Sequence, residues 1–329
     1  MKHVLFLNGI PDDRLVKVDH IKKMTNIVYV AGGSANIYPF LSDIPFKKSM
    51  AVIDTSPKQE FEVVKPHAFF NQIADADSHR IALHKTAQLL INFPDIPLFN
   101  HPKDVLKTTR DNTYRLLHDI EGLVVPKTVS ISPSSPQEIH DMVASEEIGY
   151  PFIFRGAGSH GGENTTLVTS ENEMFYAYAL DGKKPYYITQ YVDYADSDGI
   201  YTKYRFAIVD GDVFIRHVIF KDHWMIHSRS REFMQKEKYY LQKEADLLKT
   251  FETTLKPQIA PLMETIAKRV GLDYFGMDCH IDTQGNILLF ELNANMNILY
   301  NNAKDPDNIW NRQITLIVKA IEDMITRRI

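Results

Sequence analysis

The residues of this chain best suited to chemistry are two acids and an amide near its C-terminal end, Asp278, Glu291 and Asn293. Carboxylate and amide oxygens are hard donors that suit magnesium or manganese, with phosphate oxygens and water completing an octahedron. A solvated face with scattered polar residues is the alternative. Apolar residues surround Glu291 in the sequence, however, and a charge within an apolar run needs a partner. The three residues therefore predict a site for a hard divalent cation.

The spacing of these donors predicts that they share one face of a β-hairpin. Two strand-like runs flank a four-residue turn at 282–285. In that register Asp278 lies opposite Leu289, and Gly276 lies opposite Glu291. Side chains alternate faces along a strand, so all three donors point the same way. Cys279 then points to the opposite face, where we expect a buried thiol and no nucleophile.

A glycine-rich segment, Gly-Ala-Gly-Ser-His-Gly-Gly at 156–162, follows one predicted strand and precedes another. Glycines let the backbone approach a phosphate closely. The segment is not a Walker loop, because no Gly-Lys-Ser or Gly-Lys-Thr follows, and it does not open a helix as a dinucleotide fingerprint does. A flexible hairpin tip without a ligand is the alternative. Arg155 beside it, and Arg110 on an earlier segment, supply positive charge for an anion.

A second predicted hairpin, turning at Asp-Gly 210–211, carries basic side chains. Its register places Arg205 opposite Arg216, with Lys203 on the same face. Like charges placed opposite one another repel, so a bound anion would explain them, and acidic neighbours are the alternative. In the same register His217 falls on the apolar face, where we expect a packed side chain.

The predicted strands and helices that carry these residues indicate an α/β (α+β) protein of several lobes. Short apolar runs alternate with helical stretches over the first hundred residues, which predicts an N-terminal α/β lobe at 1–104. A second lobe, at 105–192, would carry the glycine segment, and a third, at 193–329, the metal residues. A chain of 329 residues is long enough for this organisation.

Composition excludes several classes of function. Hydrophobic residues make up 44% and charged residues 24% of the chain, and the formal net charge is -5. This balance argues against nucleic acid or an anionic membrane as a partner. Cys279 is the single cysteine, which rules out a disulfide within the chain and indicates a reducing compartment. No run of about 18 apolar residues is present, so we expect a cytoplasmic protein.

In order and spacing these segments resemble the ATP-grasp superfamily over about residues 105–300, and most closely its glutathione synthetase and peptide-ligase branch. The sequences Gly-Met-Asp at 276–278 and Phe-Glu-Leu-Asn at 290–293 resemble its metal-binding hairpin. The segment 154–162 resembles its strand and mobile phosphate-covering loop. The segment 188–192 resembles the hinge strand whose backbone meets adenine, and 198–205 the strand that contacts ribose and phosphate.

The resemblance implies an N-terminal lobe and two further lobes that clasp ATP, with Mg²⁺ or Mn²⁺ on Asp278, Glu291 and Asn293. The implied nucleotide-binding residues are Arg110, Arg155, Gly158, Ser159, His160, Gly161, Gly162, Gln190, Tyr191, Val192, Asp198 and Lys203. Many members carry lysine where Arg110 and Arg155 stand. Which of Lys107, Arg110 and Arg115 faces the phosphates is left open by the sequence.

The expected activity is ATP-dependent joining of a carboxylate to an amine, which gives an amide or peptide bond through an acyl phosphate. Arg205 and Arg216 are the candidates for contacting the carboxylate or the acyl phosphate. A small-molecule kinase on the same scaffold and a non-catalytic ATP-binding module are the alternatives. The expected partners are small acids and amines, including amino acids, and a homodimer is compatible with the sequence.

Overall fold

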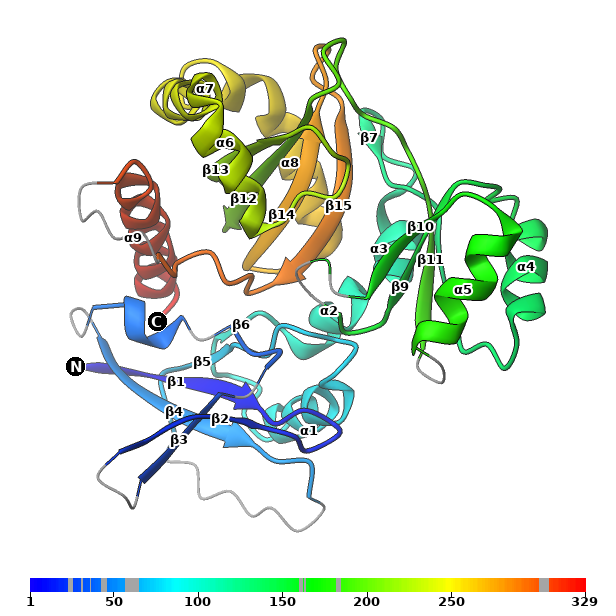
Figure 1. Cartoon of the computed structure of the whole chain (residues 1–329). Coiled ribbons are helices and arrows are strands. Elements are labelled where there is room, and N and C mark those ends of the chain that lie inside the picture. The colour runs from blue at the N-terminus through cyan, green and yellow to red at the C-terminus, as the bar shows by residue number, and fades with distance from the viewer. Residues whose placement is uncertain are drawn as a thin grey trace.

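The computed structural model describes residues 1–22, 26–30, 32–35, 37–42, 46–56, 65–159, 162, 164–181, 185–301 and 308–329. Three larger sheets carry the architecture, and helices pack on each of them (Figure 1). β2 (Lys17–Lys22) and β3 (Asn26–Val30) form a separate two-stranded sheet. Short 3-10 turns lie at Tyr38–Phe40, Leu106–Thr108 and Ser228–Ser230. The mixed sheets confirm the expected α/β class.

The first sheet is parallel, in the order β4 (Phe46–Ile53), β1 (Lys2–Gly9), β5 (Ala68–Asn71), β6 (Leu98–Phe99). Parallel strands are buried on both faces, which explains the unbroken apolar run of β1. Leu90 of α1 (Arg80–Leu90) packs on one face, and Phe6 meets α9 (Asn311–Arg328) on the other. The segment after β5 leaves the carboxyl end of this sheet, where open α/β sheets bind their ligands.

The second sheet is antiparallel, in the order β10 (Thr165–Val168), β9 (Phe152–Gly156), β11 (Tyr186–Gln190), β8 (Thr128–Ile131). Helices α4 (Pro136–Ser145) and α5 (Glu171–Asp181) cover it (Figure 1). α4 begins at Ser135, whose hydroxyl accepts a hydrogen bond from the Glu138 amide, with Pro136 in the first turn. This small lobe holds the glycine-rich segment between β9 and β10.

The third sheet has the order β13 (Asp212–Lys221), β12 (Tyr201–Val209), β14 (Tyr274–Ile281), β15 (Ile287–Ala294), β7 (Leu123–Val124). Its helices are α3 (Arg110–Leu117), α6 (Arg231–Lys236), α7 (Lys238–Thr250) and α8 (Leu255–Val270), and α2 (Pro102–Val105) leads into α3. β7 joins this sheet although it lies within the predicted second lobe. The predicted boundaries at 104 and 192 remain predictions.

A buried set of asparagines ties the first sheet to the third. The Asn100 side chain donates to Asn295 Oδ1 at 2.7 Å and to the Tyr274 carbonyl at 2.6 Å. The Asn295 side chain donates to the Asn71 carbonyl at 2.9 Å. All three asparagines are fully buried, and buried amides of this kind are retained when their hydrogen bonds are satisfied. The network fixes the end of β15 against the N-terminal lobe.

No helix in the described part of the chain is long and apolar enough to span a membrane.

Candidate functional site

A cavity of about 710 Å³ opens where the three sheets meet. Its walls come from 32–35 and 74–77 of the N-terminal lobe, from the glycine segment and the end of β11, and from the inner strands of the third sheet. Its volume lies within the range of about 300–1,000 Å³ that is usual for small-molecule sites. The cavity gathers most of the residues that the sequence indicated.

The metal-donor residues meet on the hairpin of β14 and β15, in a register different from the expected one. A bulge beside Cys279 makes Asp278 the direct partner of Glu291, and Asn293 lies opposite Gly276. The predicted pairing of Asp278 with Leu289 was therefore wrong, because a bulge adds one residue to a strand and shifts every later pair. The three donors nevertheless lie on one face, and all three line the cavity.

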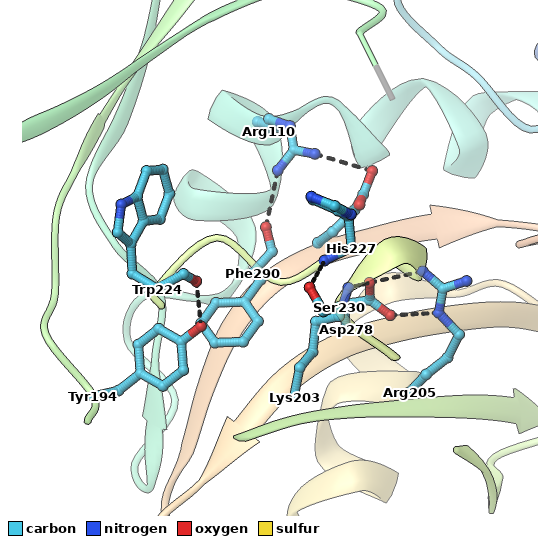
Figure 2. A network of polar contacts seen from close by, with 10 residues as sticks. Arg110, Tyr194, Lys203, Arg205, Trp224, His227, Ser230, Asp278 and Phe290 are labelled. Carbon is cyan, nitrogen blue, oxygen red and sulfur yellow. Dashed lines mark hydrogen bonds and ion pairs between the residues drawn. The ribbon is translucent and has the colours of Figure 1, made fainter. Parts of the chain in front are cut away.

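Asp278 is 3% exposed and is held by two cations (Figure 2). Arg205 binds it through Nε at 2.6 Å and Nη2 at 2.8 Å, and Lys203 Nζ lies 3.0 Å from Oδ2. Burial alone would raise the pKa of Asp278. The charges of Arg205 and Lys203 outweigh that effect and hold the pKa well below its usual value. Asp278 is therefore ionised at neutral pH.

Glu291 is held by Arg110, which reaches it from the first turn of α3. Arg110 Nη2 lies 2.9 Å from Glu291 Oε1, and Nη1 donates to the Phe290 carbonyl at 2.9 Å (Figure 2). Burial opposes ionisation, but the charge of Arg110 lowers the pKa of Glu291 to about 2. Lys107 pairs with Asp104 and Arg115 with Asp111. Of the three candidate cations, Arg110 is the one that lines the cavity.

This donor set fits a hard divalent cation. Asp278 and Glu291 are ionised and directly opposed, and the amide of Asn293 is two residues further along β15. No group of three or more His, Cys, Asp or Glu residues suited to a metal occurs in the described ranges. Two carboxylates and an amide oxygen leave the remaining positions of an octahedron for water or phosphate oxygens, as magnesium prefers.

Three described residues of the glycine segment, Gly158, Ser159 and Gly162, line the same cavity, and the segment is tied to Arg155. The Nη2 of Arg155 donates to the Ser159 carbonyl at 2.9 Å, and Gly158 and Gly162 have φ values of 68° and 82°. Burial, and then the nearby charge of Arg110, lower the pKa of Arg155 to about 10. Two adjacent arginines that repel each other suit a bound anion. His160 and Gly161 lie outside the described residues.

The far end of the cavity is aromatic. Gln190, the last residue of β11, and the two residues after it, Tyr191 and Val192, line this end, as the sequence indicated. The centroids of the Tyr194 and Phe290 rings are 4.8 Å apart. The Tyr194 hydroxyl donates a hydrogen bond to the Trp224 carbonyl at 2.7 Å (Figure 2).

Tyr194, Phe290 and Trp224 were not among the predicted site residues, because isolated aromatics carry no motif. Asp198 lies outside the cavity lining, in a turn where its amide donates to Asp196 Oδ1 at 3.0 Å.

The register of the basic hairpin also differs from the expected one. Val209 pairs with Asp212 as predicted, but a bulge at Arg216 makes His217 the partner of Arg205. The predicted pairing of Arg205 with Arg216 was wrong, and so was the placement of His217 on the apolar face, because His217 lines the cavity.

Arg216, one of the two predicted catalytic residues, lies outside the cavity lining. Its Nε donates to the Ile298 carbonyl at 2.7 Å and its Nη2 to the Tyr300 carbonyl at 3.2 Å. Burial, and then the charges of Arg205 and Arg231, lower the pKa of His217 well below its usual value. The imidazole is therefore neutral near pH 7.

The N-terminal lobe contributes a carboxylate that was not among the predicted site residues. Asp77 lines the cavity and accepts a hydrogen bond from the Tyr187 hydroxyl of β11 at 2.6 Å. It also accepts one from the backbone of Gly158, and burial raises its pKa. Asp77 therefore joins the N-terminal lobe to the lobe that carries the glycine segment.

Among the comparisons with known proteins, the one with solved structures bears on the fold. No protein-family model matches the sequence, and no curated protein matches it either. Among solved structures, the VanG D-Ala:D-Ser ligase from Enterococcus faecalis is 11% identical at a TM-score of 0.58, covering 100% of this chain and 99% of its own. The D-alanine-D-alanine ligase from Coxiella burnetii is 12% identical at a TM-score of 0.56, with coverage of 100% and 96%.

A D-alanine-D-alanine ligase from Bacillus anthracis, solved in complex with ATP, is 11% identical at a TM-score of 0.53. It covers 100% of this chain and 96% of its own. These structures are ATP-grasp proteins, and the likeness runs from one end of the chain to the other. The chain therefore has the ATP-grasp fold.

Proposed function

We propose that this chain is an ADP-forming ligase that joins a small carboxylic acid to an amine at the expense of ATP. The observation that carries the proposal is the directly opposed, ionised pair Asp278 and Glu291 in a cavity that also receives Arg110 and Arg155. A buried and a half-buried carboxylate beside two arginines suit a metal-bound polyphosphate. The fold supports the proposal, since the solved structures that share it include ligases, one of them in complex with ATP.

Different residues around the cavity would bind the metal, the phosphates and the adenine of ATP. Asp278, Glu291 and Asn293 would hold magnesium, which when bound supplies positive charge against the phosphates. Arg110 and Arg155 would hold phosphate oxygens, and Lys203 would share that task. The backbone of 190–192 and the ring of Phe290 would receive the adenine.

The proposed reaction needs positioning and charge and requires no protein nucleophile. A carboxylate oxygen of the acid attacks the terminal phosphorus of ATP, the bond to the bridging oxygen breaks, and ADP leaves. The amine nitrogen then attacks the acyl carbon, loses a proton, and phosphate departs. Fixed cations beside the reacting groups stabilise the charge that develops on the transferred phosphoryl group. Arg205, which is bound to Asp278 and lines the cavity, would be the arginine that stabilises this charge.

A product screen tests the proposal. The purified chain would be incubated with Mg²⁺, ATP and pairs of amino acids or small carboxylic acids, with ADP, phosphate and product mass followed together. We expect one ADP and one phosphate for each amide formed, and no turnover unless acid and amine are both present. A stable phosphorylated product would indicate a kinase instead.

Two variants link that activity to the proposed site. Asp278→Asn and Glu291→Gln should each lower turnover by at least about a hundredfold, equivalent to about 3 kcal/mol of transition-state stabilisation. Glu264→Gln is a matched control, because Glu264 lies on the exposed side of α8 and pairs with Lys268 alone among the ion pairs described. Full turnover in either site variant would contradict the assignment of the metal residues.

A further inference from the structure

The ion pair between Arg110 and Glu291 places a protein cation where a metal would bind. Arg110 Nη2 lies 2.9 Å from Glu291 Oε1, so the guanidinium occupies an oxygen that a divalent cation would use (Figure 2). The opposed carboxylate, Asp278, is paired with Arg205 and Lys203. In the ion pairs described, three cations therefore face two carboxylates. A free divalent cation meets repulsion there and has to compete with Arg110 for Glu291.

Asp278 keeps room for a metal while its own partners stay in place. It accepts two bonds from Arg205 and one from Lys203, whereas an ionised carboxylate offers about four acceptor sites. Both cations are on β12, which pairs directly with the β14 strand of Asp278. The sheet itself therefore fixes this cluster, and the cations do not need to leave for Asp278 to bind a metal.

Arg110 is held less firmly than the cations of Asp278. It reaches Glu291 from α3, outside the sheet, and its second described bond goes to the Phe290 carbonyl at 2.9 Å. Its side chain is 19% exposed, whereas that of Asp278 is 4% exposed. Arg110 also lines the cavity, where a ligand can reach it. Its long side chain can therefore leave Glu291 without disturbing the strands.

A polyphosphate is the ligand suited to drawing Arg110 away from Glu291. Arg155 lines the same cavity and lies near enough for the two guanidinium groups to repel each other. A phosphate chain bound to Arg155 would thus lie beside Arg110 and relieve that repulsion. Phosphate oxygens accept the paired N–H groups of a guanidinium in the same bidentate way as a carboxylate does. Transfer of Arg110 to phosphate leaves Glu291 Oε1 open to the metal.

We propose that Arg110 is an autoinhibitory gate on the metal site, which it closes by pairing with Glu291 and opens when a polyphosphate takes its guanidinium. The inference rests on the nucleotide-binding part of the function proposed above and concerns how that same site is regulated. Metal and polyphosphate then bind cooperatively, and each raises the affinity of the other by the same factor. The gate keeps free metal ions off Glu291 until the phosphates arrive.

Binding of Mn²⁺ alone to the full chain, without nucleotide, tests the gate. Electron paramagnetic resonance of free Mn²⁺ and the relaxation of water protons would both measure the affinity. We expect Arg110→Met to bind Mn²⁺ at least about tenfold more tightly than wild type, because Glu291 is no longer occupied. The same variant should bind metal-free tripolyphosphate at least about threefold more weakly. Opposite changes in the two affinities distinguish a gate from a simple phosphate contact.

Arg155→Met is the matched variant, because it removes an equal charge from the cavity without vacating Glu291. The described hydrogen bond of Arg155 goes to the Ser159 carbonyl. We expect its affinity for Mn²⁺ alone to stay within about threefold of wild type. Arg115→Met, on the exposed side of α3, should match wild type for both ligands. Thermal unfolding would confirm that each variant is folded under the conditions of the titration.

The wild-type chain provides a second measurement that needs no altered fold. The guanidinium resonances of Arg110 would be assigned in ¹⁵N NMR spectra by their loss in Arg110→Met. Tripolyphosphate with a chelator present should shift them, because the guanidinium changes partner. Mg²⁺ alone should leave them unchanged.

The inference would be overturned if Arg110→Met bound Mn²⁺ alone no more tightly than wild type, or if Arg155→Met gained as much affinity. It would equally be overturned if Mg²⁺ alone moved the Arg110 resonances, or if tripolyphosphate did not. Failure of the ligase proposal would appear separately, as absence of ADP release with every pair of acid and amine, since none of these measurements depends on turnover.

Discussion

At the scale of single residues, the sequence shows which side chains could bind a metal or a phosphate, but it does not show which residues they contact in the fold. Asp278, Glu291 and Asn293 stand out because hard oxygen donors are unusual inside an apolar hairpin. That Arg205 binds Asp278 depends on the pairing of β12 with β14, and the two residues are 73 positions apart. Nothing in the local sequence predicts such a pairing. The choice of Arg110 over Lys107 and Arg115 likewise depended on how α3, and the 3-10 turn before it that carries Lys107, meet the cavity.

The ion pair of Arg110 with Glu291 yields a prediction on pH. Glu291 has a pKa of about 2 in the folded chain, below the ordinary value of 4.5, so ionisation favours the folded state. That stability is fully present above pH 4.5 and is lost as the pH falls toward 2, because the unfolded chain takes up its proton first. The difference corresponds to about 3 kcal/mol at most.

Arg110→Met should remove much of this contribution. In metal-free protein we expect it to lower stability by about 2 kcal/mol at pH 7, and to lose less stability than wild type between pH 5 and 3. Urea unfolding across that range would measure both effects. Arg115→Met, on the exposed side of the same helix, should follow wild type. Parallel pH profiles for wild type and Arg110→Met would contradict the assignment.

At the scale of elements, most strands and helices follow from apolar periodicity and turn residues, but the bulges do not. The turn at Asp210 lies where the sequence indicated. Phe290 and Arg216 are the additional, unpaired residues of the two bulges, and nothing in the local sequence distinguishes them from ordinary strand residues. Each shifts the pairing of its strand by one residue. Because one step changes which side chains are opposite, the bulges decide the partners of Asp278 and Arg205.

Close packing at Gly276 gives a prediction for the metal hairpin. A β-carbon at this position would lie 2.5 Å from Met296 Cβ and 2.7 Å from its sulfur, so the segment after β15 would have to move. Gly276 lies opposite Asn293, which would move with it. We expect Gly276→Ala to lower stability by about 1–3 kcal/mol and to weaken binding of Mg²⁺ with nucleotide.

The double variant Gly276→Ala/Met296→Gly should recover part of both losses, because it removes the clashing atoms. Gly32→Ala is the control for unfolding alone, since a β-carbon at Gly32 would have no described atom within 4 Å but Gly32 lines the cavity. Thermal unfolding and calorimetric titration with Mg²⁺ and an ATP analogue would make the comparison. If Gly276→Ala had the stability and the binding affinity of wild type, the segment around Met296 would have moved aside without cost, which contradicts the prediction.

At the scale of the whole molecule, the lobes are joined by contacts between residues far apart in the chain. Asn100 and Asn295 are separated by 195 positions, and Asp77 and Tyr187 by 110. Patterns in a single sequence predict contacts between residues of the same helix or hairpin. They therefore predict which elements form each lobe, but not how the lobes contact one another. The overall fold became predictable through resemblance of motifs in a fixed order. The cavity shared by three lobes required the structure.

The hydrogen bond from Tyr187 to Asp77 gives a prediction about lobe closure. It connects the second sheet to the N-terminal lobe, and Asp77 also accepts a bond from Gly158 of the glycine segment. A hydrogen bond to a charged group contributes about 1.5–3 kcal/mol. Tyr187→Phe removes this hydrogen bond from the conformation in which the two lobes are in contact. Part of the free energy of nucleotide binding is then used to bring the lobes together, which weakens the observed affinity.

We therefore expect Tyr187→Phe to raise the Kd for an ATP analogue about three- to tenfold, which corresponds to roughly 1 kcal/mol, and to leave the nucleotide contacts themselves intact. Asp77→Asn should have a smaller effect, because its amide oxygen can still accept from the hydroxyl without the charge. Tyr150→Phe, whose hydroxyl meets only the sulfur of Met174 within the same lobe among the bonds described, is the control. Small-angle scattering of the nucleotide-free chain should show a larger radius of gyration for Tyr187→Phe alone, restored by the analogue. Unchanged affinity and radius would contradict a role of this hydrogen bond in closure.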